Sequence, residues 1–512
     1  MDSMTVMKEV NDLIIAAKKI SEAVNNLPPD LSLSNSVRPR VMIVGGFVRD
    51  TLRGSNPKDA DVEVFGVGSD KLVEVLQELF GSESVNEVGK SFGVIKVALP
   101  GGLELDVSIP RIDSRGVGAG HKDIEVKGDP NLSIIEAQRR RDFTINALSM
   151  DVLSGEIIDS FGGKEDLQKG ILRLVDEKTF KDDPLRVMRG VQFVARFGLT
   201  VEPKTFSFMK EMVANGALDH LPAERICGEM EKLLTKSEKP SVGLELMRDL
   251  GILERHFPEL NNMIGCEQDP FFHPEGDVWI HTKLVVDAAA MLFEKRFPCP
   301  SETAEGEYKK IKFSVMLGAL LHDVGKLSVT KRGDDGKIHS FDHETAGIEP
   351  ARAFLKRLNV SEEVLDVVLR IVRLHSLPGD QGELFFAGKM SEDQYKKATK
   401  RFLDRLQLDQ NRSFPWQAFL VVCEADYFGC NPKKDKPPFR QLAEITRIIS
   451  ELKKPFGPVI QGQEVLTLWR EIKGEDRPGG PWVGEITKII NEEGHYDPAE
   501  AMARVKEIIK TM

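Results

Sequence analysis

Cysteine is scarce in this sequence, and the few cysteines form no pattern. Five are present, an odd number, and none stands in the Cys-x-x-Cys spacing of thiolate metal sites: Cys227, Cys266, Cys299, Cys423 and Cys430. Scattered single cysteines argue against a disulfide framework and against a thiolate zinc site. We therefore expect a protein of a reducing compartment.

Long apolar runs are also missing. No stretch approaches the roughly 18 consecutive apolar residues that a membrane-spanning helix needs. The N-terminus lacks the basic region and apolar core of a signal peptide. These absences predict a cytoplasmic protein that does not engage a membrane.

An excess of positive charge is the third absence. The net charge is -11, with 29% charged and 41% hydrophobic residues among 512. A chain of this length suggests about three domains. Net charge governs solubility and long-range steering rather than local patches, so contact with nucleic acid must come from Lys and Arg clustered on one face.

Helical and strand patterns divide the chain into an α/β part and a longer helical part. After an amphipathic helix at 1–27, strand or helical patterns stand at 41–44, 61–66, 71–80 and 103–109. Beyond residue 143 helices dominate, including one at 184–197. The sequence predicts an α+β protein with an N-terminal extension and linker, a head, a helical neck, a helical body and a tail, at residues 1–37, 38–165, 166–255, 256–456 and 457–512.

Two glycines and then two aspartates follow the first strand. Gly45 and Gly46 precede an expected helix, so their N–H groups can approach a polyphosphate, although such a turn is more often plain chain reversal. Asp59 and Asp61 stand two apart in a strand pattern and therefore point to the same side. Adjacent like charges are unfavourable unless a cation lies between them, and Mg²⁺ binds carboxylates together with substrate phosphates.

A later acidic strand offers a third carboxylate. Glu104 and Asp106 alternate with apolar residues, so both point to one side of the strand. Asp106 is the candidate to align or deprotonate an attacking hydroxyl. A solvated strand face is the alternative for this pair and for the earlier aspartates.

Several longer motifs in a fixed order carry a resemblance to a known family. The segments stand at 45–50 (GGFVRD), 59–61 (DAD), 140–148 (RRDFTINAL), 162–167 (GGKEDL), 182–189 (DDPLRVMR) and 222–226 (PAERI). Together they resemble the class II tRNA nucleotidyltransferase and poly(A) polymerase family of the DNA polymerase β superfamily. The resemblance implies a polymerase β-like head, tRNA as partner, and CTP and ATP as substrates.

The resemblance also implies roles for single residues. Asp59 and Asp61 match the carboxylates that hold the catalytic Mg²⁺ ions. The RRDFTINA segment is associated with ribose and nucleotide recognition, which implicates Arg141, Asp142 and Asn146. Arg49 lies in the Gly-Gly motif and is assigned to nucleotide binding with it.

A second implied role is the choice of the base. Asp183 and Arg186 match the family's Asp and Arg that pair with the Watson–Crick edge of CTP or ATP, and their spacing allows both to face one side of a helix. The alternative is a surface ion pair. Asp182 stands where the family usually has Glu, which leaves its own role less certain than theirs.

Basic residues cluster around the same segments. They can serve triphosphate and RNA backbone, whose binding depends on such groups, or they can be solvated faces. The residues are Arg139, Arg140, Arg141, Lys169, Arg173, Arg186, Arg189 and Arg196, of which Arg189 is assigned to nucleotide binding.

Histidines concentrate in the helical body. His322 and Asp323 end an apolar helix in a segment that resembles the signature of HD-domain metal phosphohydrolases, and His281 and Asp426 suit that family's first and last ligands. Imidazoles and carboxylates together bind a divalent transition metal and activate water. His343 and His375 extend the set to a second metal or contact phosphate. The resemblance allows phosphatase and 2′,3′-cyclic phosphodiesterase activity.

Rival functions stay open at this point. We expect a CCA-adding enzyme, and the alternatives are a poly(A) polymerase, an enzyme that adds only A or only CC, an HD phosphohydrolase with an N-terminal RNA-binding module, and an RNA-binding scaffold. The segment 111–131 contains Gly116, Gly118 and Gly120 and corresponds to a flexible loop of the family's CCA-adders. It argues against an enzyme that adds only CC.

Overall fold

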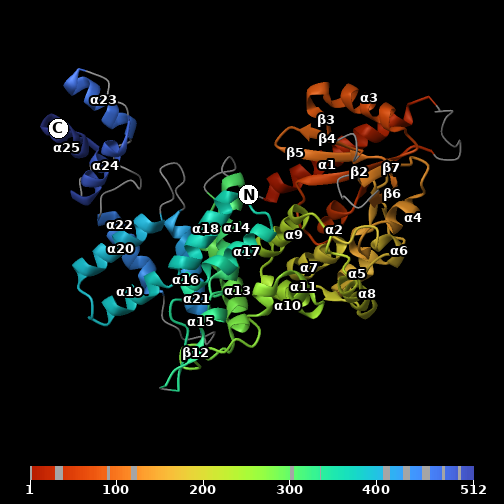
Figure 1. The fold of residues 1–512 in the computed structure, drawn as a ribbon. Helices are drawn as coiled ribbons and strands as arrows, with labels where there is room; N and C mark the ends of the chain where they lie inside the picture. The colour runs from red at the N-terminus through yellow and green to blue at the C-terminus, as the bar shows by residue number, and fades with distance from the viewer. Residues whose placement is uncertain are drawn as a thin grey trace. The chain divides into compact units, whose positions relative to one another are not determined.

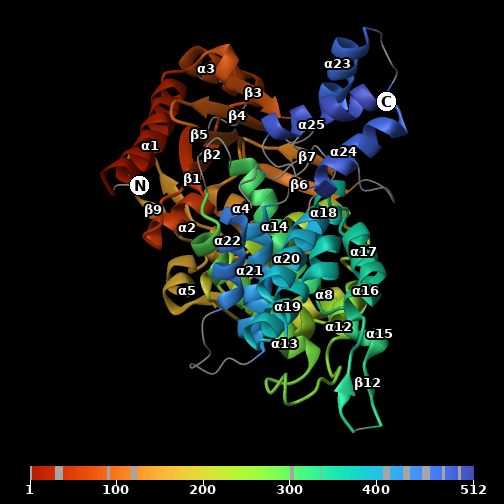
Figure 2. The ribbon, with the colours of Figure 1, turned by 90° about the vertical axis from the view of Figure 1, so that its left-hand side faces the viewer.

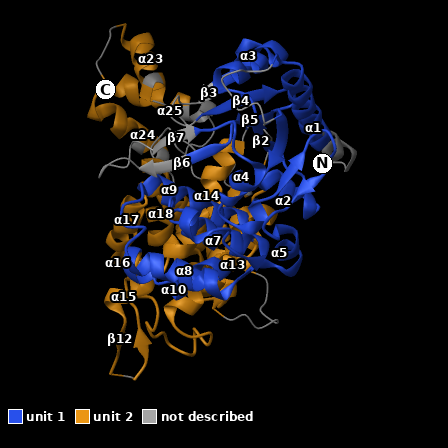
Figure 3. Cartoon of the chain, turned by 90° about the vertical axis from the view of Figure 1, so that its right-hand side faces the viewer, with its two compact units in different colours: residues 1–237, 242–256 blue, residues 238–241, 257–512 orange. Residues whose placement is uncertain are grey.

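The computed structural model divides the chain into two compact units. One comprises residues 1–237 and 242–256, and the other 238–241 and 257–512 (Figure 3). The structure describes residues 3–28, 38–88, 93–116, 124–299, 305–334, 336–406, 415–430, 439–451, 462–474, 479–493 and 498–512. The predicted linker and the predicted boundary near 456 lie largely or wholly outside these ranges.

The first unit is built on a seven-stranded mixed sheet with the order β3-β4-β5-β2-β1-β8-β9 (Figure 1). β2 and β5 run parallel and the other neighbours are antiparallel. The strands are β1 (Arg40–Val44), β2 (Asp59–Phe65), β3 (Val85–Val88), β4 (Val94–Leu99), β5 (Leu103–Ser108), β8 (Ser149–Asp151) and β9 (Ile157–Ile158). The strands expected at 41–44, 61–66 and 103–109 are confirmed.

One face of this sheet carries the core of the head. Ala60, Val62 and Val64 of β2 are buried there, because alternate residues of a strand point to opposite faces. Two amphipathic helices, α1 (Ser3–Asn25) and α3 (Ser69–Phe80), complete the same apolar cluster. The helix expected at 1–27 is therefore part of the core of the head, and the opposite face of β2 and β5 is left for polar side chains.

A two-stranded ribbon follows β5. It consists of β6 (Arg111–Gly116) and β7 (Ile124–Gly128), which pair antiparallel. Gly118 and Gly120 of the expected flexible loop lie outside the described residues.

Helices make up most of the rest of the first unit, as predicted. The helix expected at 184–197 begins two residues later, at α7 (Arg186–Phe197), because the backbone first makes tight turns from Asp183 and Pro184 to Arg186 and Val187. The other helices are α2 (Gly46–Leu52), α4 (Ile134–Arg139), α5 (Gly163–Lys169), α6 (Glu177–Phe180), α8 (Pro203–Ala214), α9 (Ala223–Lys236), α10 (Pro240–Asp249) and α11 (Ile252–His256).

The second unit is helical, and its centre is a group of helices with few polar residues. α13 (Val278–Arg296), α14 (Glu305–Leu321) and α21 (Trp416–Gly429) pack against one another, and α18 (Glu362–Leu374) packs on α14 (Figures 1 and 2). Residues 313–321 of α14 and 418–425 of α21 are buried on all sides, which is typical of helices in the middle of a domain, whereas α13 buries one face. The other described helices up to α22 (Arg440–Glu451) and a small hairpin lie around this group.

The last described helices have a small core of their own. α23 (Gly462–Lys473), α24 (Pro481–Glu493) and α25 (Pro498–Thr511) bury an apolar cluster that includes Trp469 and Ile486. Across the described ranges, no helix combines the length and the apolar character needed to cross a membrane.

Candidate active sites

The face of the sheet opposite the core carries the predicted carboxylates. Asp59 and Asp61 are exposed on β2, and the parallel register places Asp61 directly beside Asp106 of β5. Glu63 continues the row on β2. Both strands alternate between this polar face and the core, so the sheet brings the three predicted acids together.

The surroundings of Asp61 raise the pKa of its carboxyl group. Desolvation is the largest cause of the raised pKa of Asp61. The positive charge of Arg141 opposes this effect, and the negative charges of Asp106 and Asp59 add to it. A carboxylate beside other carboxylates favours a bound cation or a proton. The Nζ atom of Lys96 on β4 lies 3.1 Å from Asp106 Oδ1 and supplies part of the missing charge. These donors fit a hard divalent cation.

The turn between β1 and α2 is shaped around Arg141. Gly45 has a φ of +67°, and a β-carbon on it would lie 2.5 Å from Nη1 of Arg141. Only glycine combines this backbone conformation with so close an approach. Arg141 donates to Glu63 Oε1 at 2.7 Å, so it links the Gly45–Gly46 turn to the acidic face.

A buried polar network connects the other residues expected to bind nucleotide. Arg49 Nη1 donates to Asn146 Oδ1 at 2.5 Å, and Asn146 Nδ2 donates to Asp142 Oδ1 at 2.9 Å. Arg189 Nε donates to Asp142 Oδ2 at 2.7 Å. Burial disfavours the carboxylate, but Arg189 and Asn146 outweigh it and hold the pKa of Asp142 at about 2.

This network joins three segments that are distant in sequence. Arg49 comes from α2, Asp142 and Asn146 from the RRDFTINA segment, and Arg189 from α7. The guanidinium carbon of Arg49 also lies 4.5 Å from the ring centre of Phe197. Because each side chain in the network is held by its neighbours, the network fixes α2, the RRDFTINA segment and α7 relative to one another.

Asp183 and Arg186 do not face one side of a helix, and that expectation is wrong. Asp183 lies in the turn before α7, where its carboxylate accepts from the Leu185 N–H at 3.2 Å. Its charged partner is Arg225 of α9, whose Nη2 lies 3.0 Å from Asp183 Oδ2. Arg186 instead donates to the backbone oxygens of Thr179 at 2.7 Å and Arg140 at 2.5 Å. The sequence did not reveal Arg225 as a partner, although it stands in the PAERI motif.

Other basic residues of the predicted cluster are engaged in ion pairs. Arg173 Nε lies 3.0 Å from Asp166 Oδ2, and Arg140 Nη2 lies 3.6 Å from Asp182 Oδ2. Lys169 pairs with Glu165 one helical turn away. For these residues the structure favours the alternative that they belong to a charged, solvated surface.

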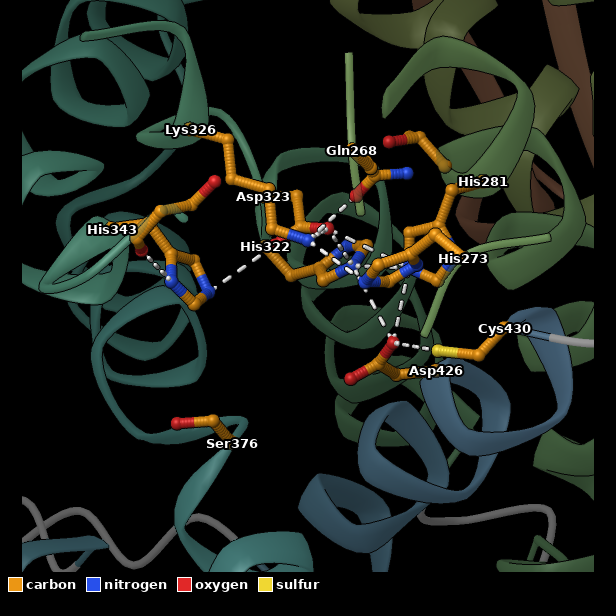
Figure 4. A network of polar contacts seen from close by, with 12 residues as sticks. Gln268, His273, His281, His322, Asp323, Lys326, His343, Ser376, Asp426 and Cys430 are labelled. Carbon is orange, nitrogen blue, oxygen red and sulfur yellow. Dashed lines mark hydrogen bonds and ion pairs between the residues drawn. The ribbon is translucent and has the colours of Figure 1, made fainter. Parts of the chain in front are cut away.

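The second unit brings the predicted histidines and aspartates to one point. His281 comes from α13, His322 and Asp323 from the turn after α14, and Asp426 from α21 (Figure 4). His281 Nε2 lies 3.0 Å from Asp426 Oδ1 and 3.2 Å from His322 Nε2. His322 Nε2 lies 3.2 Å from Asp323 Oδ2. Uncharged imidazoles and carboxylates this close can share one cation.

A second group of donors adjoins the first through Asp323. Its Oδ2 faces the first pair of histidines, and its Oδ1 lies 3.3 Å from His343 Nε2 and 3.9 Å from His375 Nε2. His343 begins the short helix α16 (His343–Ala346), and His375 follows α18. Asp323 is therefore placed to join two groups of ligands.

Hydrogen bonds at Nδ1 leave the Nε2 atoms of these histidines available to a metal. His322 Nδ1 lies 2.8 Å from the Ala319 oxygen and His375 Nδ1 lies 2.9 Å from the Val372 oxygen, so each N–H donates to the backbone. His343 Nδ1 makes the same contact with Ser340 at 3.0 Å. Partners of this kind fix the tautomer and the ring orientation of metal-binding histidines.

Sequence reasoning missed the partners behind these ligands. The carboxylate of Glu275, 1% exposed, accepts from His281 Nδ1 at 2.9 Å and from His273 Nδ1 at 2.8 Å. Lys326 Nζ lies 2.7 Å from both Asp323 Oδ2 and Gln268 Oε1 (Figure 4). Lys326 follows the His-Asp pair closely, whereas Glu275 shows no signal in its own pattern.

Two histidines of this cluster have strongly shifted pKa values. Burial disfavours a charged imidazole, but hydrogen bonds with Asp426 and Glu275 outweigh it and raise the pKa of His281 to about 9. Burial and the neighbouring His322 lower the pKa of His375 to about 4. Buried charges that depend on each other in this way are typical of functional sites.

Replacement of Glu275 by Gln is expected to weaken metal binding about tenfold, because such supporting carboxylates raise ligand basicity and contribute about 10- to 100-fold to affinity. Calorimetric titration of the metal-free protein with Zn²⁺ or Mn²⁺ measures the effect. The matched control is Glu349→Gln, whose side chain is 81% exposed on α17 (Ile348–Arg357). Equal affinities of the two variants would show that Glu275 does not support the site.

Comparison with known proteins assigns these segments to domains. The Poly A polymerase head domain matches residues 41–173. The probable RNA and SrmB-binding site of polymerase A matches 198–264, and the HD domain matches 278–407. The carboxylate row thus lies in a polymerase head, and most of the histidine cluster lies in an HD domain.

Relatives and solved structures span nearly the same length. Multifunctional CCA proteins of Nitrosococcus oceani and Nitrosomonas europaea are each 32% identical to this chain, covering 78% and 80% of it and 86% and 88% of their own lengths. The CCA-adding enzyme of Bacillus stearothermophilus in complex with CTP has a TM-score of 0.56 at 21% identity, covering 100% of both chains. The Thermotoga maritima CCA-adding enzyme complexed with tRNA has a TM-score of 0.51 at 18% identity, covering 99% of this chain and 97% of its own.

The matched domains define the class of protein, a nucleotidyltransferase with an attached HD domain. At this level of identity and coverage, the chain belongs to the family of the multifunctional CCA proteins. The structural likeness supports the fold throughout the chain.

Proposed function

We propose that this protein adds C, C and A in turn to the 3′ end of tRNA, using CTP and ATP. The observation that carries the proposal is the row of Asp59, Asp61 and Asp106 on the open face of the head. A binding module needs no such set of carboxylates, which weighs against a head that only holds RNA. The family membership points to the same reaction.

The residues of the head have separate tasks in the proposed reaction. Asp59 and Asp61 would hold Mg²⁺, which supplies charge stabilisation at the nucleotide phosphates. Asp106 orients the RNA 3′-hydroxyl and receives its proton as the hydroxyl oxygen bonds to the α-phosphorus, while the bond from that phosphorus to the leaving pyrophosphate breaks. The N–H of Gly45 donates to the Leu148 oxygen, so the turn offers the triphosphate the first N–H groups of α2, and Arg141 links this turn to the acidic face. Most of the rate enhancement then comes from positioning and electrostatics.

Asp183 and Arg186 choose the base in this proposal. Asp183 offers acceptors and Arg186 offers donors to the edge of cytosine or adenine. The Arg225 ion pair orients Asp183, and two backbone oxygens orient Arg186. Because these partners restrict the rotamers of both side chains, Asp183 and Arg186 can act as a fixed template for the base.

Arg186→Ala is expected to lower the preference for CTP and ATP over UTP and GTP at least about tenfold, since it removes donors that read the base edge. Single-nucleotide incorporation into tRNA lacking its 3′ end measures this ratio. Lys169→Ala, on the charged face of α5, is the matched control because it also removes one positive charge. Unchanged discrimination in Arg186→Ala would contradict the assignment.

The proposed reaction itself is tested with labelled CTP and ATP and tRNA transcripts that lack all of CCA, its last two nucleotides, or only the final A. Sequential addition of C, C and A that then stops supports the proposal. Addition of A alone, of CC alone, or of a long A tail would place the protein with a partial enzyme or a poly(A) polymerase.

We also propose that the HD domain is a metal-dependent phosphohydrolase that acts as a phosphatase or a 2′,3′-cyclic phosphodiesterase. A divalent transition metal would be held by His281, His322, Asp323 and Asp426, and it would supply activated water and charge stabilisation.

We propose a cytoplasmic location for the protein. The tRNA substrate and the five free cysteines support this location.

A further inference from the structure

Two segments that border the HD site expose aromatic side chains. Phe271 and Phe272 are 84% and 65% exposed, and Phe341 is 70% exposed. Exposed aromatic side chains gain free energy when a partner covers them. Three exposed rings in two neighbouring segments are therefore a feature that calls for a ligand.

The first segment leads directly into the HD site. A turn built by Asp269 presents the phenylalanines, because its carboxylate accepts from the Phe271 N–H at 2.9 Å. The next residue, His273, reaches Glu275 at 2.8 Å and lies 3.5 Å from Lys326 Nζ. Phe271 and Phe272 directly precede His273, and adjacent Cα atoms are about 3.8 Å apart. Both phenylalanines therefore lie within two residues of the HD site.

The second segment is a short hairpin with its own aromatic and basic face. β12 (Lys331–Arg332) pairs with β13 (Ile338–His339), so Lys331 lies directly opposite His339. The ring of His339 stacks on Phe341, with 4.9 Å between centres and 12° between planes. His343 of the HD site follows two residues later. Exposed Lys331 and Phe341 thus share one face with the half-buried His339.

The two segments lie side by side. Arg332 Nη2 of the hairpin lies 3.5 Å from Glu267 Oε2 of the first segment, and Figures 1 and 2 show the hairpin beside that loop beyond α15 (Lys326–Val329). Rings and cations interleaved on one surface are the elements that bind unpaired nucleotides, because each base stacks and each phosphate meets a cation. Lys331 is the cation that the hairpin offers to this surface, because Arg332, its neighbour in the strand, points to the opposite face and is paired with Glu267.

We propose that Phe271, Phe272, Phe341 and Lys331 form a binding surface for the unpaired 3′ end of RNA and deliver its terminal phosphate to the HD site. The proposal rests on the proposed phosphohydrolase function. In the reaction served, a water oxygen bonds to phosphorus of a 2′,3′-cyclic phosphate, one ribose P–O bond breaks, and the released ribose oxygen takes the proton. The surface makes the HD site selective for nucleotides over simple phosphate esters.

The test compares two esters that differ only by the nucleobases. One is a trinucleotide ending in a 2′,3′-cyclic phosphate, and the other is the abasic trimer with the same sugar–phosphate backbone and the same terminal 2′,3′-cyclic phosphate. Phe271→Ala/Phe272→Ala is expected to raise KM for the trinucleotide about tenfold, with kcat within about twofold of wild type and the base-free ester unaffected. Met291→Ala, which removes a 69% exposed side chain from α13, is the control. An unchanged KM ratio in the double variant would overturn the proposal.

A second measurement tests RNA binding by this surface independently of phosphate hydrolysis. If the wild-type protein hydrolyses neither ester, the phosphohydrolase function fails, and ultraviolet crosslinking of the trinucleotide to the full chain then decides on the surface. Crosslinks on peptides with residues 271–272 or 341 support it, and crosslinks confined to other peptides overturn it. A shift from oligomer to monomer in the double variant, measured by light scattering, would overturn it in favour of an interface between copies of this chain.

Discussion

Asp61→Ala and Asp61→Asn are expected to abolish incorporation of both CTP and ATP, with a loss of at least about a thousandfold. Asp61 stands between Asp59 and Asp106 at the centre of the carboxylate row. Loss of a metal-holding carboxylate removes several kcal/mol of transition-state stabilisation, and each 1.36 kcal/mol is a factor of ten in rate. Because the chemical step is shared, both nucleotides are lost together, unlike in Arg186→Ala.

The stability of Asp61→Asn separates a catalytic role from a structural one. The pKa of Asp61 is raised in the folded protein, so the folded state binds its proton more tightly than the unfolded state. Ionised Asp61 therefore lowers the stability of the fold at neutral pH, and this cost disappears as the pH falls and the carboxyl is protonated. Asn, which carries no charge, is expected to leave the melting temperature unchanged or slightly raised.

The matched control for these variants is Glu78→Ala on α3, the helix that covers the opposite face of the sheet. It also removes one negative charge, and full activity is expected. Incorporation by Asp61→Ala within about tenfold of wild type would refute the assignment of the carboxylate row, and a large drop in melting temperature would show that Asp61 acts on the fold.

Asp323→Asn is expected to lower the affinity of the HD site for a divalent transition metal at least about a hundredfold. Asp323 faces His322 with one oxygen and His343 with the other, so its replacement affects both groups of ligands. Loss of a direct ligand exceeds the 10- to 100-fold effect of supporting groups. Metal analysis after dialysis measures the effect, and phosphodiesterase activity is expected to fall while CCA addition persists.

Two further variants make this result interpretable. Asn in place of Asp323 leaves the buried Lys326 ammonium without its carboxylate, which destabilises a fold. His343→Ala is therefore the second variant, because it removes a ligand of the second group alone and is expected to leave one metal bound. Asp366→Asn, at an exposed position of α18, is the control. Full metal content in Asp323→Asn would exclude the HD cluster as the metal site.

Local sequence patterns determined a large part of the head. Alternation in a strand dictates that Asp59 and Asp61 share a face, and the structure places them so. The glycine at position 45 likewise follows from a turn with a positive φ. Such features need only short-range sterics, so they can be predicted from neighbouring residues.

Long-range packing decided what local patterns could not. The register that sets Asp61 beside Asp106 exists only once β5 pairs parallel to β2. Asp183 was expected on one helix face with Arg186, but the tight turn before α7 places it opposite Arg225 of a different helix. A pair of charges in sequence does not fix its partners, because the partners arrive on other elements.

The HD site shows the same division most clearly. The sequence by itself, through the His-Asp pair and its resemblance, determined that His281, His322, Asp323 and Asp426 are candidate ligands. Only the tertiary structure decided that they converge, and that Glu275 orients His281 from behind. His281, Asp426 and the His322–Asp323 pair stand on three separate elements, so no periodicity of the chain encodes the distances between them. Those distances follow from the packing of apolar helix faces, which the sequence specifies only through the whole fold.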